Sequence, residues 1–432
     1  MNSFQLSQDQ HDAVTGICNT LLDPTTTSHV LTVLTGSAGT GKTTVVKEII
    51  DQLLYQACDL DVALCATTHR AATVLKEITG TEVTTGHALF KLRPAVNSHG
   101  KEVLSKAGTC NISHGSVIII DESSMIGNKF LKAIVEIVKE RKLKLIFVGD
   151  PFQLPPPTDM CSLFDGSLST FTLTQVHRQL GGNPVLEKAN EFREYIEGIR
   201  TIEPILHTDI NAKGEGIHVL SHADFVAKFV QKYMDYSTGA EVDMPLCTYT
   251  NESAINYNNM VRKAAYFLEN TIEPFYIGER LIANSVVMDG EKTVLANNET
   301  VHVVNYVEDE SYEIPGYFVT VEGDYNVYTK SNIKTVFSPK TKAAADKILK
   351  EWKAIAKQNN SKQDWQQYYQ IQNSLADLRP PFAGTTHKAQ GGTFPAVFID
   401  KINIDKCRDS ATRARLFYVA LTRATTNVYI NS

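Results

Sequence analysis

The chain has 432 residues, of which 43% are hydrophobic and 21% charged, and this composition is typical of a globular protein with two or more domains. Its 48 acidic and 42 basic residues give a formal net charge of −6, which excludes an overall basic protein but not a local basic groove. The seven cysteines are scattered and form no Cys-x-x-Cys pair, which argues against a disulfide framework or a structural zinc and favours a reducing cytoplasm.

The first half of the chain has the pattern of an α/β domain. A helix is expected within residues 1–23, with Ser7 as its N-cap and without the basic and apolar regions of a signal peptide. Apolar strands separated by helices follow, at 30–35, 61–66, 116–120 and 144–148. Such strands predict a parallel sheet covered on both faces. Residues 91–115, rich in turn residues, interrupt the pattern and predict a hairpin excursion.

The second half predicts another α/β block that is split by an insertion. A strand at 246–250 and a helix from Ser253 belong to this block. Residues 275–338 read as strands with turns between them, which predicts a small β-barrel, and the polar residues 340–378 read as helical. The apolar strands return at 397–400 and 427–430. No apolar run approaches the length that spans a membrane.

A glycine-rich loop after the first strand predicts a phosphate site. It lies between that strand and a helix, the context in which backbone N–H groups and a helix N-terminus surround phosphates. Lys42 would reach the β- and γ-phosphates, and Thr43 would hold Mg²⁺. The residues expected to bind the nucleotide are Gly36, Ser37, Ala38, Gly39, Thr40, Gly41, Lys42, Thr43 and Thr44.

Acidic and amide side chains follow two later strands. Asp121 and Glu122 end the strand at 116–120, where Asp121 would hold Mg²⁺ and Glu122 would polarise the attacking water. Gln153, after the strand at 144–148, would hydrogen-bond the γ-phosphate. The chain therefore predicts an enzyme that binds and hydrolyses a nucleoside triphosphate.

These segments resemble motifs I, II and III of the superfamily 1 helicases, and the remaining motifs follow in order. The similarity is to the RecD-like branch, superfamily 1B, and to the small phage helicases of the Dda type. The further motif-like segments are Leu6–Gln10 (Q motif), Cys65–Ala72 (Ia), Thr84–Leu89 (Ib), Leu173–Arg178 (IV), Gly384–Thr393 (V) and Tyr418–Ala424 (VI).

The resemblance implies two RecA-like domains around ATP and Mg²⁺. The first would span residues 1–178, with the insertion 91–115, and the second 179–270 and 381–432. A further insertion, 271–380, would hold an SH3-like β-barrel at 275–338 and the helical segment 340–378. Gln10 would read the adenine, Arg178 would be a cation for the γ-phosphate, and Arg423 would be the arginine finger.

The resemblance also implies a path for single-stranded DNA and movement from 5′ to 3′. Expected substrates are single strands and forked or tailed duplexes, and expected partners are a single-strand-binding protein or a replisome component. The protein would act as a monomer in the cytoplasm, or in the host cytoplasm if phage-encoded, in replication or recombination. The residues expected along the path are Thr67, His69, Thr85, His87, Thr386 and His387.

Two features leave alternatives open. Trp365 either stacks on a base or, as aromatics at helical spacing more often do, packs in a core. The excursion 91–115 would be the pin that separates the strands, but it carries no aromatic residue, so Val103 or Leu104 would be an apolar wedge.

Three functions follow: a DNA helicase, an ATPase on single-stranded DNA that displaces proteins with little unwinding, or an RNA-directed helicase. The histidines have no convincing metal-binding spacing, so Mg²⁺ is the only metal expected.

Overall fold

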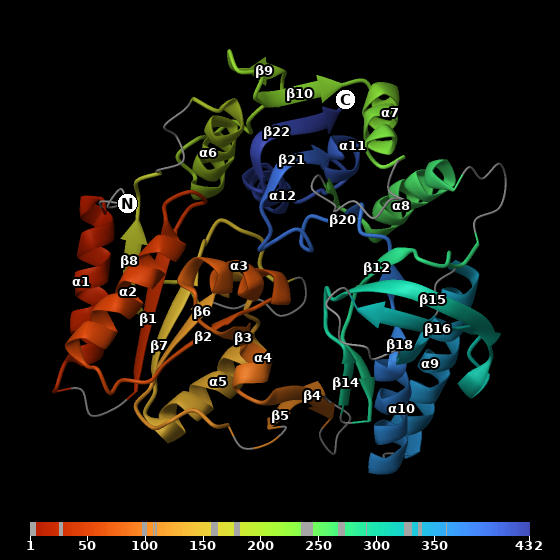
Figure 1. Ribbon diagram of the computed structural model, residues 1–432, viewed down its shortest axis with the longest axis horizontal. Coiled ribbons are helices and arrows are strands. Elements are labelled where there is room, and N and C mark those ends of the chain that lie inside the picture. The colour runs from red at the N-terminus through yellow and green to blue at the C-terminus, as the bar shows by residue number, and fades with distance from the viewer. Residues whose placement is uncertain are drawn as a thin grey trace.

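Among the described residues, three six-stranded sheets and two smaller two-stranded sheets organise the fold (Figure 1). The computed structural model describes residues 6–25, 29–96, 102–106, 108, 110–156, 163–176, 182–234, 245–266, 273–290, 292–323, 331–335, 339–359 and 361–432. No helix in these ranges combines the length and apolar character needed to cross a bilayer.

The first sheet is parallel and has six strands in the order β3-β2-β6-β7-β1-β8. Its strands are β1 (Val30–Gly36), β2 (Val62–Ala66), β3 (Val83–Thr85), β6 (Val117–Asp121), β7 (Lys144–Gly149) and β8 (Ser169–Leu173). Helices α1 (Gln8–Leu22) and α2 (Lys42–Gln56) cover one face, and α5 (Asn128–Arg141) covers the other. The strands are apolar throughout because both faces are buried.

Shorter elements complete this first unit. They are α3 (His69–Thr79), α4 (Gly86–Leu89), η1 (Ser123–Met125) and the antiparallel hairpin of β4 (Leu92–Val96) and β5 (Glu102–Lys106). The hairpin lies within the predicted excursion and pairs Pro94 with Leu104.

The second sheet joins segments that lie far apart in the sequence. Its order is β20-β11-β21-β22-β10-β9, and its strand pairs are parallel except β9–β10. The strands are β9 (Asp209–Ile210), β10 (Gly216–Leu220), β11 (Leu246–Thr248), β20 (Ala383–Thr385), β21 (Phe394–Ile399) and β22 (Ala424–Asn431). The helices are α6 (Pro184–Glu197), α7 (His222–Lys232), α8 (Asn251–Ala265), α11 (Lys401–Ile404) and α12 (Ser410–Thr422). Residues 416–422 of α12 are all buried, as expected of a helix that packs on every side.

The third sheet lies between β11 and β20 in the chain and is mainly antiparallel, in the order β18-β17-β16-β15-β12-β19. Its strands are β12 (Arg280–Ala283), β15 (Thr300–Asp309), β16 (Gly316–Gly323), β17 (Ser331–Thr335), β18 (Leu375–Ala376) and β19 (Leu378–Arg379). Beside it lie the pair β13 (Val287–Asp289) and β14 (Lys292–Leu295), the turn η4 (Ser311–Glu313), and the helices α9 (Pro339–Asn359) and α10 (Lys362–Ser374). The SH3-like character of this unit stays a prediction.

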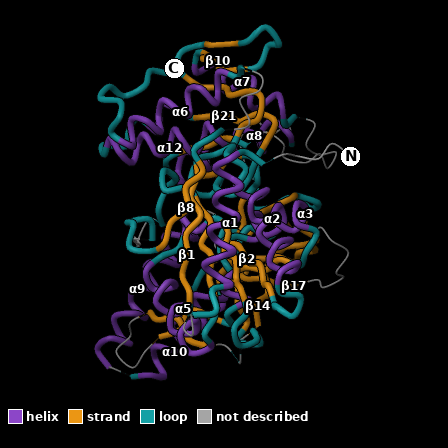
Figure 2. Tube along the Cα trace, turned by 90° about the vertical axis from the view of Figure 1, so that its left-hand side faces the viewer, coloured by secondary structure: helices purple, strands orange, loops and turns teal. Residues whose placement is uncertain are grey.

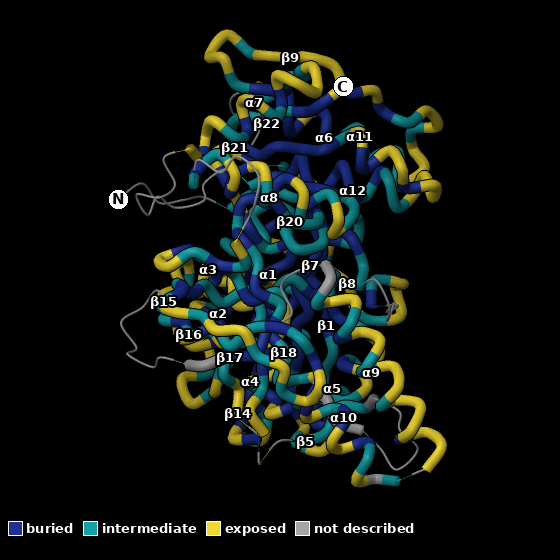
Figure 3. The backbone as a smooth tube through the Cα atoms, turned by 90° about the vertical axis from the view of Figure 1, so that its right-hand side faces the viewer, coloured by how far each residue is buried: buried dark blue, intermediate teal, exposed yellow. Residues whose placement is uncertain are grey.

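The sheet-bearing units pack around a common centre. Figure 2 shows α6, α12 and β21 at one end of the molecule and α5, α9, α10 and β14 at the other. In Figure 3 the buried backbone follows the sheets and α12, whereas much of α9, α10 and β9 is exposed. The α/β fold with two parallel sheets that the sequence predicts is confirmed, and it is consistent with two RecA-like domains.

Candidate nucleotide site and nucleic-acid path

The glycine-rich loop lies at the carboxyl end of β1 and opens α2, so the expected strand, loop and helix are all present. Gly41 adopts a left-handed φ of 79°, and a Cβ there would lie 2.5 Å from Nε2 of Gln10. Nζ of Lys42 donates to the carbonyl oxygens of Gly36 (2.7 Å) and Ser37 (3.0 Å). The ammonium therefore lies across the loop, where phosphates bind in such loops.

Gln10 supports this loop from inside the protein. Its side chain is fully buried, its Nε2 donates to the Thr40 carbonyl at 2.9 Å, and its Oε1 accepts from the Ser7 N–H at 3.0 Å. In this arrangement the amide braces the loop and has no exposed surface. The adenine-reading role of Gln10 stays a prediction.

Asp121 and Glu122 lie together at the end of β6, beside the loop. Oδ1 of Asp121 accepts the Glu122 N–H at 2.8 Å. Burial, and then the charge of Glu122, raises the pKa of Asp121 to about 7, while Lys42 opposes the shift. Two crowded carboxylates that feel the charge of Lys42 suit a divalent cation, because Mg²⁺ prefers oxygen ligands. Thr43 and Asp121 would hold it, and the ion would neutralise phosphate charge.

The loop after β7 contacts the second unit. Nε2 of Gln390 donates to Oε1 of Gln153 (3.3 Å) and to the Leu154 carbonyl (3.0 Å). Arg415 of α12 donates to the carbonyls of Pro151 (2.6 Å) and Gln153 (3.0 Å). The side chain of Gln153 thus faces the second unit, and its γ-phosphate contact stays a prediction.

Tyr418 of α12 also crosses between the units. Its hydroxyl accepts from the Ala38 N–H at 3.1 Å and donates to Oδ2 of Asp150 at 2.6 Å. The contacts of Tyr418, Arg415, Gln390 and Asp150 were not anticipated from the sequence. The motif V and VI strings contain two of these residues, Gln390 and Tyr418, but nothing in a string identifies which side chain crosses between units.

Arg423, the predicted arginine finger, forms its hydrogen bonds within the second unit. Arg423 is 5% exposed and donates to the carbonyls of Gly392 (3.1 Å) and Val419 (3.3 Å) and to Oγ1 of Thr422 (3.2 Å). All three acceptors belong to the second unit, so the crossing contact expected of Arg423 is absent from this arrangement. Arg178 lies outside the described residues.

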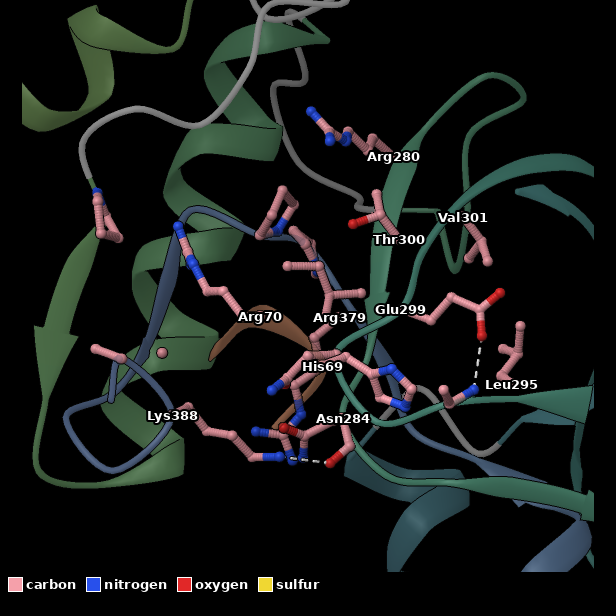
Figure 4. A pocket seen from close by; sticks show the side chains of 18 of the residues that line it. His69, Arg70, Arg280, Asn284, Leu295, Glu299, Thr300, Val301, Arg379 and Lys388 are labelled. Atoms are coloured by element: carbon pink, nitrogen blue, oxygen red, sulfur yellow. Dashed lines mark hydrogen bonds between the residues drawn. The ribbon is translucent and has the colours of Figure 1, made fainter. Parts of the chain in front are cut away.

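A cavity of about 840 Å³ opens where α3, the third sheet and the segment after β20 meet (Figure 4). Side chains that carry or can carry positive charge line it: His69, Arg70, Arg280, Arg379 and Lys388. Two acids, Glu77 and Glu299, also line it. Such a basic recess suits a phosphate backbone.

Motif V forms one wall of this cavity. Nζ of Lys388 donates to the Asn284 carbonyl (2.8 Å) and to Oδ1 of Asn297 (3.0 Å), which ties this wall to the third sheet. Arg70 of α3 places its guanidinium 4.1 Å from the centre of the Phe394 ring. The cavity is thus lined by all three units.

The four residues of the first unit that were predicted to line the single-strand path differ in their exposure and contacts. His69 is exposed and lines the cavity. His87 is exposed and stacks on Phe130 with 4.3 Å between ring centres. Oγ1 of Thr67 donates to the Glu122 carbonyl at 3.2 Å, and Oγ1 of Thr85 caps α4. Thr67 therefore links this face to the acidic pair.

Two predicted DNA contacts are wrong in this structure. Thr386 is fully buried, and its hydroxyl donates to the Thr248 carbonyl at 3.1 Å, so it joins strands inside the sheet. Trp365 is 6% exposed and packs between α9 and α10 against Tyr368, so the core alternative holds. His387 is half-buried, whereas its neighbours Thr385 and Lys388 line the cavity.

Comparisons with known proteins match both units. A family described as an AAA domain matches residues 5–203, and one described as a UvrD-like helicase C-terminal domain matches residues 381–431. The ATP-dependent RecD2 DNA helicase of Deinococcus radiodurans is 35% identical over 164 residues, which cover 38% of this chain and 21% of that protein. The match thus spans about a fifth of RecD2.

A second relative matches nearly end to end. The ATP-dependent DNA helicase Dda of Enterobacteria phage T4 is 23% identical over 426 residues, which cover 92% of this chain and 93% of Dda. The crystal structure of the Pif1 helicase from Candida albicans aligns with a TM-score of 0.48 and 16% identity, covering 100% of this chain and 95% of that one. The two family matches and the similarity to RecD2 and Dda support a helicase of superfamily 1B.

Proposed function

We propose that this chain is an ATP-dependent helicase that moves 5′ to 3′ along single-stranded DNA and separates duplexes by opening and closing its two RecA-like units. The supporting observation is that one segment after β20 reaches both sites. Lys388 lines the basic cavity, and Gln390 bonds Gln153 near the nucleotide loop. A change at the nucleotide cleft therefore moves a wall of the cavity.

The proposal assigns the units as residues 1–178, and 179–270 with 381–432, around the insertion 271–380. Lys42 orients the phosphates, and Glu122 acts as general base toward water. Arg178 and Arg423 would complete the cleft when it closes. Both units bind the DNA strand. If their affinities for the strand alternate as the cleft opens and closes, the protein moves along the strand.

A second candidate is a protein-displacing ATPase with little unwinding activity. It is favoured by the absence of Phe, Tyr and Trp between Lys91 and Gly115 in the sequence, so the segment lacks the large aromatic side chains that stack on bases.

Forked DNA substrates test these proposals. We expect ATP-dependent unwinding of a fork or duplex with a 5′ single-stranded tail and none with only a 3′ tail. We also expect ATPase stimulation by single-stranded DNA above that by RNA of the same sequence. Unwinding from the 3′ tail would reverse the polarity, and stripping of a bound protein without unwinding would favour the second candidate. Stronger stimulation by RNA would favour an RNA-directed enzyme.

The wedge prediction needs a correction at Leu104. This side chain packs against the core of the first unit, so Leu104→Asp would destabilise the fold as well as any wedge. Val103 is half-buried, and strand alternation places it on the opposite face of β5. It is therefore the cleaner position for a test.

We expect Val103→Asp to lower unwinding of a fork by several-fold while the ATPase rate with single-stranded DNA stays near wild type. The reason is that a charge at an apolar wedge would not hold base pairs apart, whereas the ATP site lies elsewhere. The exposed Lys91→Asp at the start of the hairpin is the matched control. Equal loss of both activities in Val103→Asp would argue against a wedge.

A further inference from the structure

The hydroxyl of Tyr418 joins three segments that are distant in sequence: α12, the nucleotide loop and the loop after β7. Tyr418 is 1% exposed and Asp150 is fully buried. Within the described part of the chain, no other hydrogen bond joins residues 36–43 to the second unit. Among the described residues, the hydrogen bonding between the nucleotide loop and the second unit therefore depends on one oxygen atom.

The direction of each bond follows from the chemistry of the groups. Burial, and then the charge of Asp150, raises the pKa of Tyr418 well above its usual value, so the phenol keeps its proton. The O–H donates to the Asp150 carboxylate, which leaves a lone pair to accept the Ala38 N–H. Oδ1 of Asp150 accepts the Phe152 N–H at 3.0 Å, so the same carboxylate shapes the turn that presents Gln153.

The Ala38 N–H is also one of the loop amides available to a phosphate. A backbone amide has one hydrogen, so Tyr418 and a phosphate oxygen compete for it. A phosphate that accepts this hydrogen would break the hydrogen bond between Ala38 and Tyr418. The hydrogen bond from Tyr418 to Asp150 would remain. From Asp150 the contacts continue through Gln153 to Gln390 and to the cavity wall.

We propose that Tyr418 is a positioning residue that couples occupancy of the nucleotide loop to the grip on the nucleic acid. The inference rests on the proposed function, because it needs both a nucleotide and a strand. Tyr418 is thus a residue of the second unit that bonds the nucleotide loop directly, whereas the hydrogen bonds that Arg423 donates stay within the second unit.

The test is a thermodynamic cycle on Tyr418→Phe, which removes the hydroxyl and keeps the ring. The affinity for a labelled oligo-dT is measured with and without the Mg²⁺ complex of β,γ-imido-ATP. The measured quantity is the ratio of the two oligo-dT affinities, with and without the analogue. We expect this ratio to be about 5- to 150-fold in the wild type, the usual range for coupled sites, and below about twofold in Tyr418→Phe. Without DNA, Tyr418→Phe should bind the analogue more tightly, because the Ala38 N–H is free.

The matched control is Tyr257→Phe. This tyrosine is also buried, and its hydroxyl lies by Asp400 and Asn431 within the second unit. Its loss should lower the melting temperature and leave the ratio at the wild-type value. Asp150→Asn weakens the same acceptor without a change of shape, and its ratio should also fall even if Tyr418→Phe does not fold.

The outcomes separate the two proposals. A wild-type ratio in both Tyr418→Phe and Asp150→Asn would overturn the role of Tyr418 and leave the helicase proposal standing. A wild-type protein in which the analogue has no effect on oligo-dT affinity would overturn both.

Discussion

Lys42→Ala should lower the ATPase rate with single-stranded DNA by about 10²- to 10³-fold or more, the loss usual when one preorganised charge-stabilising donor is removed. Nζ of Lys42 is held across the loop by the carbonyls of Gly36 and Ser37, so alanine removes the cation from the place where phosphate charge develops. Binding to an oligo-dT in the absence of nucleotide should stay measurable, because the basic cavity is built from other residues. ATP hydrolysis and DNA binding are measured on the same preparation.

The control for Lys42 is Lys47→Ala. Lys47 lies further along α2 and is exposed, so its loss removes the same charge from the same helix without touching the loop. Near-normal hydrolysis by Lys42→Ala would refute the nucleotide site, and loss of both activities by Lys47→Ala would show a general effect of helix charge.

Glu122→Gln should lower the rate of hydrolysis by about 10²- to 10⁴-fold, the range for loss of a general base. Glu122 follows β6 with a left-handed φ of 52°, and its carbonyl is held by Oγ1 of Thr67. Glutamine keeps the size of the side chain but cannot accept the proton of water, so nucleotide binding should persist while turnover stops.

Two measurements check this prediction: binding of a fluorescent ATP analogue and a single-turnover hydrolysis rate. The control is Glu136→Gln, an exposed acid on α5. If Glu122→Gln lost nucleotide binding together with hydrolysis, the residue would hold the metal or the fold rather than act as the base.

The sequence predicted local structure well where the residues that determine an element lie within that element or next to it. The apolar strands and the glycine-rich loop occur where expected, and Ser7 caps α1. Each depends on neighbours within a few residues: strand apolarity, the φ of Gly41 or a capping side chain. The resemblance to superfamily 1B rests on the same local strings and is confirmed.

Long-range side-chain directions were predicted less well. Trp365 and Thr386 have sequence contexts compatible with a DNA contact, yet both are buried by segments that the local sequence does not specify. Arg423 and Tyr418 lie close together in one motif, yet Tyr418 bonds the Ala38 N–H of the nucleotide loop and Arg423, just after α12, bonds the Gly392 carbonyl.

The sequence by itself determined that this protein has a nucleotide loop, an acidic pair, two parallel-sheet units and the ordered motifs of a helicase. These properties are local, because they depend on residue type and spacing along the chain. Only the tertiary structure decided which side chains cross between the units: Tyr418 on the Ala38 amide, Gln390 on Gln153, and Lys388 at the cavity. The physical reason is that a crossing contact requires two buried surfaces to meet in one orientation, and that orientation is set by the packing of all three sheets together.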